Sequence, residues 1–300
     1  MHVAVNSPIT GKEAHLLYAI ASADLIRYYA DELQIDIRYI LRDLPSIALY
    51  QCHDTGYRFF YPFNIDGDGQ FYEKLEQIPW YYADWKWDYD VAKDFIPNQA
   101  SVLDIGCGEG KFLRYLKEQK QCACVGLELN QMAQQLATQH QLQVYNEMVQ
   151  DHAKQNKNCY DVVTFFQVLE HIADITSFVH AAIDVVKPGG YIIVAVPNND
   201  PYYLKNDKDH VLNLPPHHMG WWNENSLRAL GQQFHLQTIA VKKQPLQHYS
   251  AYAKALLKYR FKLPSTLTKL LAPMAKLFVY FNKQNINGAS ILIVYQKPKA

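Results

Sequence analysis

Three alternating glycines, Gly106, Gly108 and Gly110, follow an apolar run that reads as a buried strand, and a helix pattern begins just beyond them. Glycine accepts positive φ angles and lets a ligand approach the backbone closely. The helix N-terminus offers N–H groups to the negative end of a ligand. Glu128 ends the next apolar run, about 20 residues past the turn, where an acid accepts both hydroxyls of a ribose. The pattern predicts a nucleotide-type ligand at this turn.

Further motifs follow this turn in order. After Asp-Ile-Gly-Cys-Gly-Glu-Gly at 104–110 come Gly-Leu-Glu-Leu-Asn at 126–130, Tyr-Asp-Val-Val-Thr-Phe-Phe-Gln-Val-Leu-Glu-His-Ile at 160–172, Lys-Pro-Gly-Gly at 187–190 and Val-Pro-Asn at 196–198. A pyrophosphate cradle usually reads Gly-x-Gly-x-x-Gly, whereas the glycines here alternate. The set resembles the class I S-adenosylmethionine-dependent methyltransferases from about residue 87 to 199. The resemblance is specific for fold and cofactor and names no substrate.

The resemblance implies how S-adenosylmethionine binds. Asp104 would lie under the ammonium group of the cofactor, Glu128 would hold the ribose, and Gln167 would contact the methionine portion. Met148 and Val149 occupy the place whose backbone contacts the adenine ring. The predicted cofactor residues are Asp104, Gly106, Cys107, Gly108, Gly110, Glu128, Leu129, Met148, Val149 and Gln167. In the alternative interpretation, Asp104 caps the turn and Glu128 caps the helix that starts at Asn130.

Three histidines are candidates for proton transfer. Pro-Pro-His-His at 215–218 resembles a segment of bacterial methyltransferases that act on small molecules and sugars. A hydroxyl acceptor needs a base for its proton, and histidine suits that role at neutral pH. We predict His217 or His218 as this base, with His171 next; alternatively, these histidines hold backbone carbonyls. Glu170 is interpreted as structural. No acid with ligand spacing accompanies the histidines, so no metal site is predicted.

Aromatic residues are candidates for the substrate side of the site. Tyr81 and Tyr82 lie in a run of aromatic residues just before the first strand of the predicted sheet, and Trp221 follows the two histidines. An aromatic face over the sulfonium would favour its positive charge. The alternative is that the run at 80–87 packs in a core.

Strands and helices alternate through most of the chain, which is typical of a doubly wound parallel sheet. Strands are expected near 101–105, 122–128, 142–146, 160–166, 190–196, 235–243 and 289–295. The resemblance adds that the last two strands form an antiparallel hairpin. We therefore predict an α/β fold with a Rossmann-like, doubly wound, seven-stranded sheet, six strands parallel and one antiparallel. Residues 1–98 would form an N-terminal helical cap, with helices near 11–31 and 69–96 around a strand-like segment at 47–62, and residues 99–300 the cofactor-binding domain.

An inserted helical segment at 245–287 separates the last two strands and is basic. After Glu224 the chain contains no acid but twelve of its 29 Lys and Arg residues, although the total charge is zero. From Ser265 the apolar residues recur as one helical stripe, backed by lysines at 269, 276 and 283. Pro273 would kink this helix. The segment is either a lid that packs its stripe on the core, or an interfacial helix that contacts an anionic membrane or a lipid-linked substrate.

Composition bounds the compartment and the partners. The five cysteines form no Cys-x-x-Cys pair, and no basic segment precedes the apolar residues near the N-terminus. A cytoplasmic protein is expected, with peripheral contact at the inner membrane face as an option. No Asn/Asp-Pro-Pro-Tyr/Phe/Trp motif follows the strand at 160–166, so no nucleic-acid substrate is expected. The oligomeric state is not indicated.

These observations predict an enzyme that transfers a methyl group from S-adenosylmethionine to a small-molecule or lipid-linked acceptor. A hydroxyl of a sugar or polysaccharide precursor is the leading acceptor, and a quinone-type ring hydroxyl is second. A catalytically inactive, cofactor-binding partner subunit is the alternative from a different class.

Overall fold

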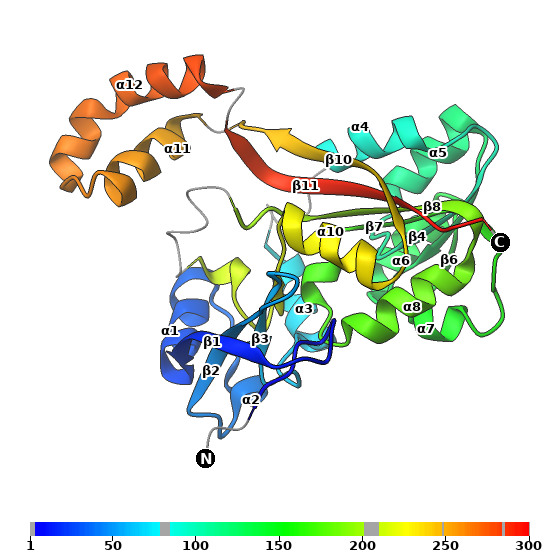
Figure 1. The fold of residues 1–300 in the computed structure, drawn as a ribbon, viewed down its shortest axis with the longest axis horizontal. Helices are drawn as coiled ribbons and strands as arrows, with labels where there is room; N and C mark the ends of the chain where they lie inside the picture. The colour runs from blue at the N-terminus through cyan, green and yellow to red at the C-terminus, as the bar shows by residue number, and fades with distance from the viewer. Residues whose placement is uncertain (1–3, 79–84, 201–209, 248, 284–285, 300) are drawn as a thin grey trace.

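The computed structural model describes residues 4–78, 85–200, 210–247, 249–283 and 286–299. It contains a large sheet flanked by helices, a smaller sheet built mainly from the N-terminal residues, and a helical hairpin that extends away from both (Figure 1). Within those ranges, no helix combines the length and apolar character needed to cross a membrane.

The large sheet confirms the predicted fold. Its strand order is β10-β11-β8-β7-β4-β5-β6, and β11 alone runs antiparallel to its neighbours. The strands are β4 (Ser101–Ile105), β5 (Ala123–Leu127), β6 (Gln143–Tyr145), β7 (Tyr160–Phe166), β8 (Val186–Pro197), β10 (Gln237–Pro245) and β11 (Asn287–Gln296). The chain leaves β4 toward β5 and β6 and then returns to β7 on the other side of β4. Ligands of such sheets bind at the carboxyl ends of the strands where the order reverses, here β4 and β7.

Helices cover both faces of this sheet, which explains its nearly continuous apolar strands. They are α4 (Trp87–Ala92), α5 (Lys111–Lys120), α6 (Gln131–Gln139), α7 (Val149–His152), α8 (Ile175–Val185) and α10 (Glu224–Gln233), with short 3-10 turns η1 (Lys93–Phe95), η2 (Leu169–His171) and η3 (Val211–Asn213). Side chains of α4 and α5 share one core cluster with the sheet, and those of α8 and α10 share another. Figure 1 shows these two pairs on opposite sides of the sheet.

The N-terminal part corrects the prediction of a helical cap. It holds a four-stranded antiparallel sheet, β1-β2-β3-β9, together with helices. The elements are β1 (Ala14–Ala21), α1 (Ser22–Leu33), α2 (Arg38–Leu41), β2 (Ser46–Cys52), β3 (Arg58–Tyr61), α3 (Gly69–Glu76) and β9 (Gly220–Trp221). The helix expected near 11–31 begins only at Ser22, because the preceding apolar residues pair with β2 as a strand. Tertiary pairing here overrides a pattern that is ambiguous between helix and strand. The strand-like segment at 47–62 is confirmed by β2 and β3.

Some segments of each part of the chain pack in the core of the other part. Tyr89 and Ala92 of α4 pack on the large sheet, although they precede residue 99. Val211, Leu214 and Trp221 pack in the core of the N-terminal part, although they follow it. We propose a domain boundary between residues 98 and 99, which these segments cross.

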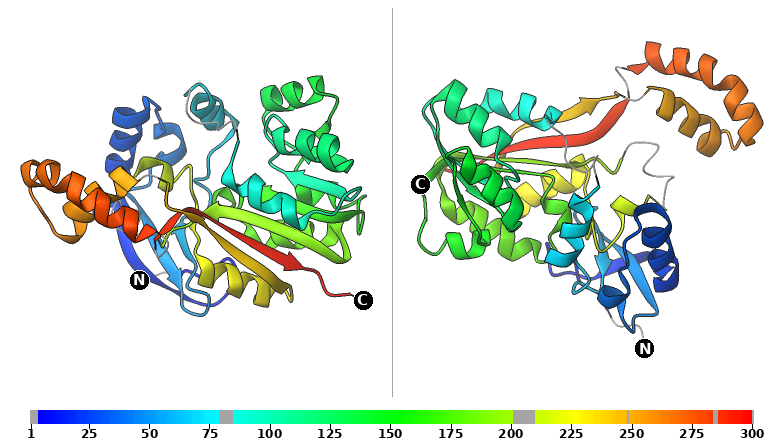
Figure 2. Two further views of the ribbon diagram at one scale, coloured as in Figure 1. Left: turned by 90° about the horizontal axis from the view of Figure 1, so that it is seen from above. Right: turned by 180° about the vertical axis from the view of Figure 1, so that it is seen from behind.

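The insertion consists of α11 (Tyr249–Ala255), a π-helical turn η4 (Leu256–Arg260) and α12 (Ser265–Phe281). The helix predicted from Ser265 is therefore confirmed, and it continues past Pro273. The hairpin formed by α11 and α12 leaves the sheet between the end of β10 and the start of β11, and both views in Figure 2 show it projecting from the body of the protein.

Candidate active site

The glycine turn at the end of β4 is closely packed at two positions and open at the third. Gly106, Gly108 and Gly110 all have positive φ angles, of 70°, 53° and 73°. A Cβ atom at Gly106 would lie 2.6 Å from Val168, and one at Gly110 would lie 2.3 Å from Leu142. A Cβ at Gly108 would meet no described atom within 4 Å. The open side of Gly108 is therefore where a ligand can approach the turn.

Glu128 joins this turn to the end of β5. Its carboxylate accepts hydrogen bonds from the backbone N–H groups of Gly108 and Asn130, both at 2.8 Å. Asn130 itself caps α6 by accepting from the N–H of Ala133. A carboxylate has about four lone-pair directions, and these two bonds orient that of Glu128 beside the turn.

Asp104 is a buried carboxyl group on β4, beside the turn. Its Oδ1 accepts a hydrogen bond of 2.7 Å from the hydroxyl of Thr164 on β7. Burial raises the pKa of Asp104 to about 7, and the hydrogen bond from Thr164 and the charge of Lys86 oppose this rise. A cation placed against Asp104 would relieve the cost of its buried charge, which fits the predicted contact with an ammonium group.

Apolar side chains flank the turns after β5 and β6. Leu129 and Met148 are exposed to 57% and 56%, unusually high values for large apolar residues. The Asn146 side chain donates to the carbonyl oxygens of Glu128 and Leu129, which ties the two turns together. The exposed side chains of Leu129 and Met148 suit the predicted contact with the adenine ring. Val149 and Cys107 are buried in core clusters, so contacts from them to the cofactor would involve only their backbone.

Gln167 directly follows β7 and has a left-handed conformation, with a φ angle of 58°. Such strained residues cluster at functional sites. Its side-chain amide donates to Asp88 (3.1 Å) and to Ser290 (3.3 Å), and Ser290 donates to Asp88 (2.5 Å). Burial raises the pKa of Asp88. Sequence reasoning missed Asp88 and Ser290, because nothing in the local pattern links a residue of α4 to one on the last strand.

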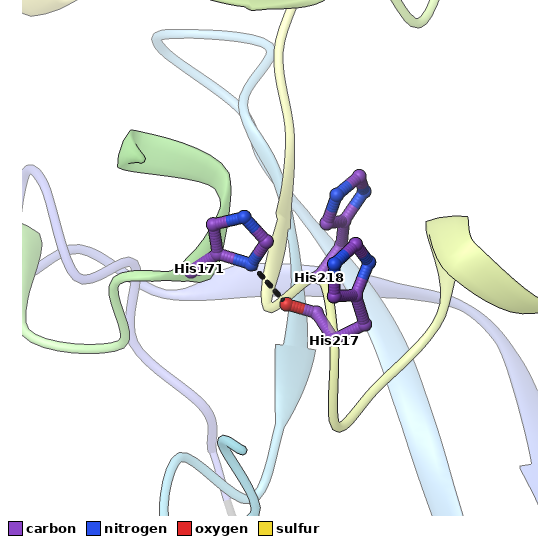
Figure 3. Close-up of side chains that lie close together, drawn as sticks. All are labelled: His171, His217 and His218. Atoms are coloured by element: carbon purple, nitrogen blue, oxygen red, sulfur yellow. Dashed lines mark hydrogen bonds between the residues drawn. The ribbon is translucent and has the colours of Figure 1, made fainter. Parts of the chain in front are cut away.

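The three predicted histidines lie close together near the carboxyl end of β7 (Figure 3). His171 lies on η2, which follows β7, and His217 and His218 lie on the turn between η3 and β9. The ring centroids are 4.6 Å apart for His171 and His217, 5.0 Å for His171 and His218, and 4.4 Å for His217 and His218. Val168 packs against Gly106 and precedes His171 by three residues, so the cluster adjoins the glycine turn.

Carbonyl oxygens determine which nitrogen carries the proton in each of the three rings. The Nδ1–H of His171 donates to the carbonyl of His217 (2.5 Å), and the Nδ1–H of His217 donates to that of Leu212 (2.7 Å). His218 Nδ1 lies 3.1 Å from the side-chain oxygen of Asn213, whose amide group donates to Asn199. Because a carbonyl oxygen can only accept, Nδ1 carries the proton in each neutral ring and Nε2 carries the lone pair.

Burial keeps these histidines neutral. It lowers the pKa of His171 to about 4 and the pKa values of His217 and His218 well below the usual value, and repulsion between two protonated rings would lower the latter two pKa values further. Neutral imidazoles can accept a proton at pH 7. Their low pKa values make them weak bases, which suit an acceptor whose own proton is acidic.

Glu170 is a deeply buried carboxyl group, which the sequence did not indicate. It is 1% exposed, and burial raises its pKa to about 8, so it is mostly protonated at pH 7. Its Oε2 has no hydrogen-bond partner in the described part of the chain, and Oε1 lies 4.0 Å from Nε2 of His171. A buried carboxyl oxygen without a hydrogen-bond partner is costly, and this one belongs to a group that lies beside the candidate base. We therefore add Glu170 to the candidate site.

The cluster brings one potential ligand atom from each histidine within 4.8 Å of the others. The rings of His217 and His218, however, lie at only 18° to each other, with their centroids 4.4 Å apart. Because the nitrogen lone pairs lie in the ring planes, stacked rings direct them side by side rather than toward one ion. The absence of a metal cofactor stays a prediction.

The predicted substrate-side residues have different positions. Tyr81 and Tyr82 lie outside the described residues. Trp221 is buried, packs edge-on against Phe60 and donates its indole N–H to the carbonyl of Asn213 (2.6 Å). A direct substrate contact by Trp221 would require the side chain to leave this core. Where it lies, it holds in place the residue that orients His218.

Comparisons with known proteins identify the family. A family profile described as "Methyltransferase domain" matches residues 82–241, more than half of the chain. The chain belongs to this family. The methyltransferase domain is also 34% identical, over 108 residues, to ubiquinone biosynthesis O-methyltransferases from Yersinia pestis (strain Pestoides F) and Yersinia pseudotuberculosis serotype O:1b (strain IP 31758); each match covers 34% of this chain and 44% of the relative. The matched region thus spans less than half the length of these curated relatives.

A solved structure supports the same fold. The SAM-dependent methyltransferase from Archaeoglobus fulgidus superimposes with a TM-score of 0.50 at 15% identity, covering 70% of this chain and 92% of that one. The cofactor of the methyltransferase domain is S-adenosylmethionine. The open side of Gly108, the oriented carboxylate of Glu128 and the buried Asp104 fit the turn, the ribose and the ammonium group of this cofactor.

Proposed function

We propose that this protein methylates a hydroxyl oxygen of a small or lipid-linked acceptor, bound between the carboxyl edge of the large sheet and the N-terminal part. The observation that carries the proposal is the buried, neutral histidine cluster beside the cofactor edge. When bound, S-adenosylmethionine supplies an electrophilic methyl group on a positively charged sulfur.

The chemistry of the cluster favours oxygen over nitrogen as the acceptor atom. A neutral amine attacks through a lone pair that it already has, whereas a hydroxyl must lose its proton as it attacks. The His218 ring, held by Asn213, presents Nε2 as a proton acceptor, and protonated Glu170 can donate a hydrogen bond to an acceptor oxygen. The surrounding burial excludes water from the transfer.

The low pKa values of the histidines bear on the acceptor class. A phenolic hydroxyl has a pKa of about 10, which is far below that of an aliphatic alcohol, so a weak base can deprotonate it more readily. This argument and the named activity of the Yersinia relatives favour a quinone-type ring hydroxyl. A sugar hydroxyl, which leads on the sequence pattern alone, becomes the second candidate, supported by the resemblance of the Pro-Pro-His-His segment.

The test is a panel of catechols and phenols, with and without prenyl tails, against sugar nucleotides and lipid-linked sugars. We expect release of S-adenosylhomocysteine and a methylated product with a phenolic acceptor. Product formation only with sugars would overturn the ring-hydroxyl proposal. Cofactor binding without turnover on any acceptor would instead support the inactive partner subunit.

A further inference from the structure

The α12 helix carries a broad exposed apolar face. Leu270 and Met274 are each 72% exposed, Phe278 is 61% exposed and Phe281 is 75% exposed. Leu267 and Leu277 extend the same face. In the part of the chain that the structure describes, this face does not pack on the sheet as the lid interpretation requires. Contiguous exposed apolar residues of this kind mark interaction surfaces.

The opposite face of α12 holds the hairpin together. Val279 is fully buried, and with Leu246 and Ala253 it forms a small cluster to which Ala275 and Tyr252 add. Counting about 100° per residue, the exposed apolar residues lie roughly opposite this buried face, and Lys269, Lys276 and Lys283 lie beside the buried face, roughly 150° from the centre of the apolar one. The hairpin thus has its own core and exposes its apolar face, and α12 carries its lysines on the polar side of the helix.

The basic charge of the hairpin favours an anionic partner for this face. Residues 245–287 hold seven bases and no acid: Lys254, Lys258, Arg260, Lys262, Lys269, Lys276 and Lys283. A second copy would bring like charges against like, which disfavours self-association through this face. An apolar face of leucine, methionine and phenylalanine with lysines on the polar face is typical of helices that lie in the interface of an anionic bilayer. The bases complement the negative surface, and the apolar residues enter the boundary of the acyl chains.

The hairpin also lies at the edge of the active site. It connects the end of β10 to the start of β11, where Ser290 pairs with Pro197 at the carboxyl end of β8. The hydroxyl of Ser290 donates to Asp88, which also accepts from Gln167. Only two residues separate the first residue of β11, Asn287, from Ser290, so the hairpin is joined to the sheet close to the residues that line the candidate site.

We propose that the α11–α12 hairpin docks the protein on anionic phospholipid bilayers, so that a lipid-soluble acceptor reaches the carboxyl edge of the sheet from the membrane. The delivery of the acceptor rests on the proposed function, whereas the docking does not. In this proposal the exposed face of α12 binds the bilayer surface.

The test is flotation of the full chain with vesicles, without any acceptor. One vesicle type contains phosphatidylglycerol and phosphatidylcholine, and the other contains phosphatidylcholine alone, each at low and high salt. We expect at least a roughly tenfold preference for the anionic vesicles that salt weakens, since each lysine near such a surface adds to the attraction. Equal, negligible binding to both vesicle types would overturn the proposal.

Three variants sharpen the result. The triple change Leu270→Ser, Met274→Ser and Phe278→Ser, and the triple change of Lys269, Lys276 and Lys283 to Gln, should each reduce binding roughly tenfold or more. Leu16→Ser with Leu17→Ser removes exposed apolar side chains from β1 and should leave binding unchanged. Unaltered affinity for cofactor shows that the variants fold. Binding that neither triple change reduces, or self-association through the hairpin in light scattering, contradicts the proposal.

The outcomes separate the two proposals. Vesicle binding without methylation of any hydroxyl acceptor upholds docking and defeats the proposed function. Methylation of a water-soluble phenol without vesicle binding does the reverse.

Discussion

Gly108→Asn should strongly weaken cofactor binding while leaving the protein folded. Gly108 has a φ angle of 53°, and a Cβ there meets no described atom within 4 Å. Asn is the residue other than glycine that adopts this conformation most readily, so the strain should cost below about 1 kcal/mol. Its side chain would fill the space in which the cofactor approaches the turn. We expect an affinity loss of at least about 100-fold, or roughly 2.7 kcal/mol.

Two further glycine variants control this experiment. Gly11→Asn has the same kind of backbone, with a φ angle of 68° and no atom within 4 Å of the added Cβ, but Gly11 lies in the N-terminal part. It should leave both affinity and stability nearly unchanged. Gly110→Asn should destabilise the fold, because its Cβ would lie 2.3 Å from Leu142. The assay is calorimetry with S-adenosylhomocysteine alongside thermal unfolding. Unchanged affinity in folded Gly108→Asn would refute the assignment of the cofactor to this turn.

Three other predictions concern the same edge. Glu128→Ala should weaken S-adenosylhomocysteine binding by on the order of 2 kcal/mol or more, because charge-assisted hydrogen bonds to the ribose are lost; an unchanged dissociation constant in calorimetry would point to another acid. The folded-state pKa of Asp104 is about 7, above its ordinary value of 3.8, so the folded protein holds a proton that the unfolded chain releases, and this group's contribution to stability falls as pH rises from about 4 through 7. Affinity for the cofactor's ammonium group should rise over the same range, and Asp104→Asn should flatten both profiles in denaturant titrations and calorimetry. Dialysis against EDTA should leave turnover unchanged, and recovery of lost activity by added zinc would show that the histidine cluster holds a metal.

The sequence predicted the large sheet well, because apolar runs of strand length alternate there with helical patterns. It failed at β1, where the apolar run Ala14–Ala21 fits a helix or a strand and only pairing with β2 decides between them. It identified the stripe on α12 but could not tell whether the stripe faces the core or solvent, because that depends on where the hairpin leaves the sheet.

The candidate site was predictable in part for a similar reason. Local motifs indicated Glu128 and the histidines as candidates, since each lies within a recognisable segment. The bond between Asp88 and Ser290 joins residues 202 positions apart, and no local pattern reveals it. The burial of Glu170, whose Oε2 has no hydrogen-bond partner among the described residues, and the tautomer that Asn213 imposes on His218 arise only when the N-terminal part and the sheet come together.

The central claim is that the cofactor edge and the histidine cluster form one active site for hydroxyl methylation. The most direct measurement is turnover with the best acceptor at saturating S-adenosylmethionine, in the wild type and in His217→Gln and His218→Gln, with cofactor affinity measured on the same samples. His53→Gln, an exposed histidine in the N-terminal part, is the matched control. We predict that at least one of the two cluster variants loses roughly 10²-fold in kcat, as expected for a lost general base, with cofactor affinity intact and the control unaffected. Wild-type turnover that neither His217→Gln nor His218→Gln lowers would contradict the account.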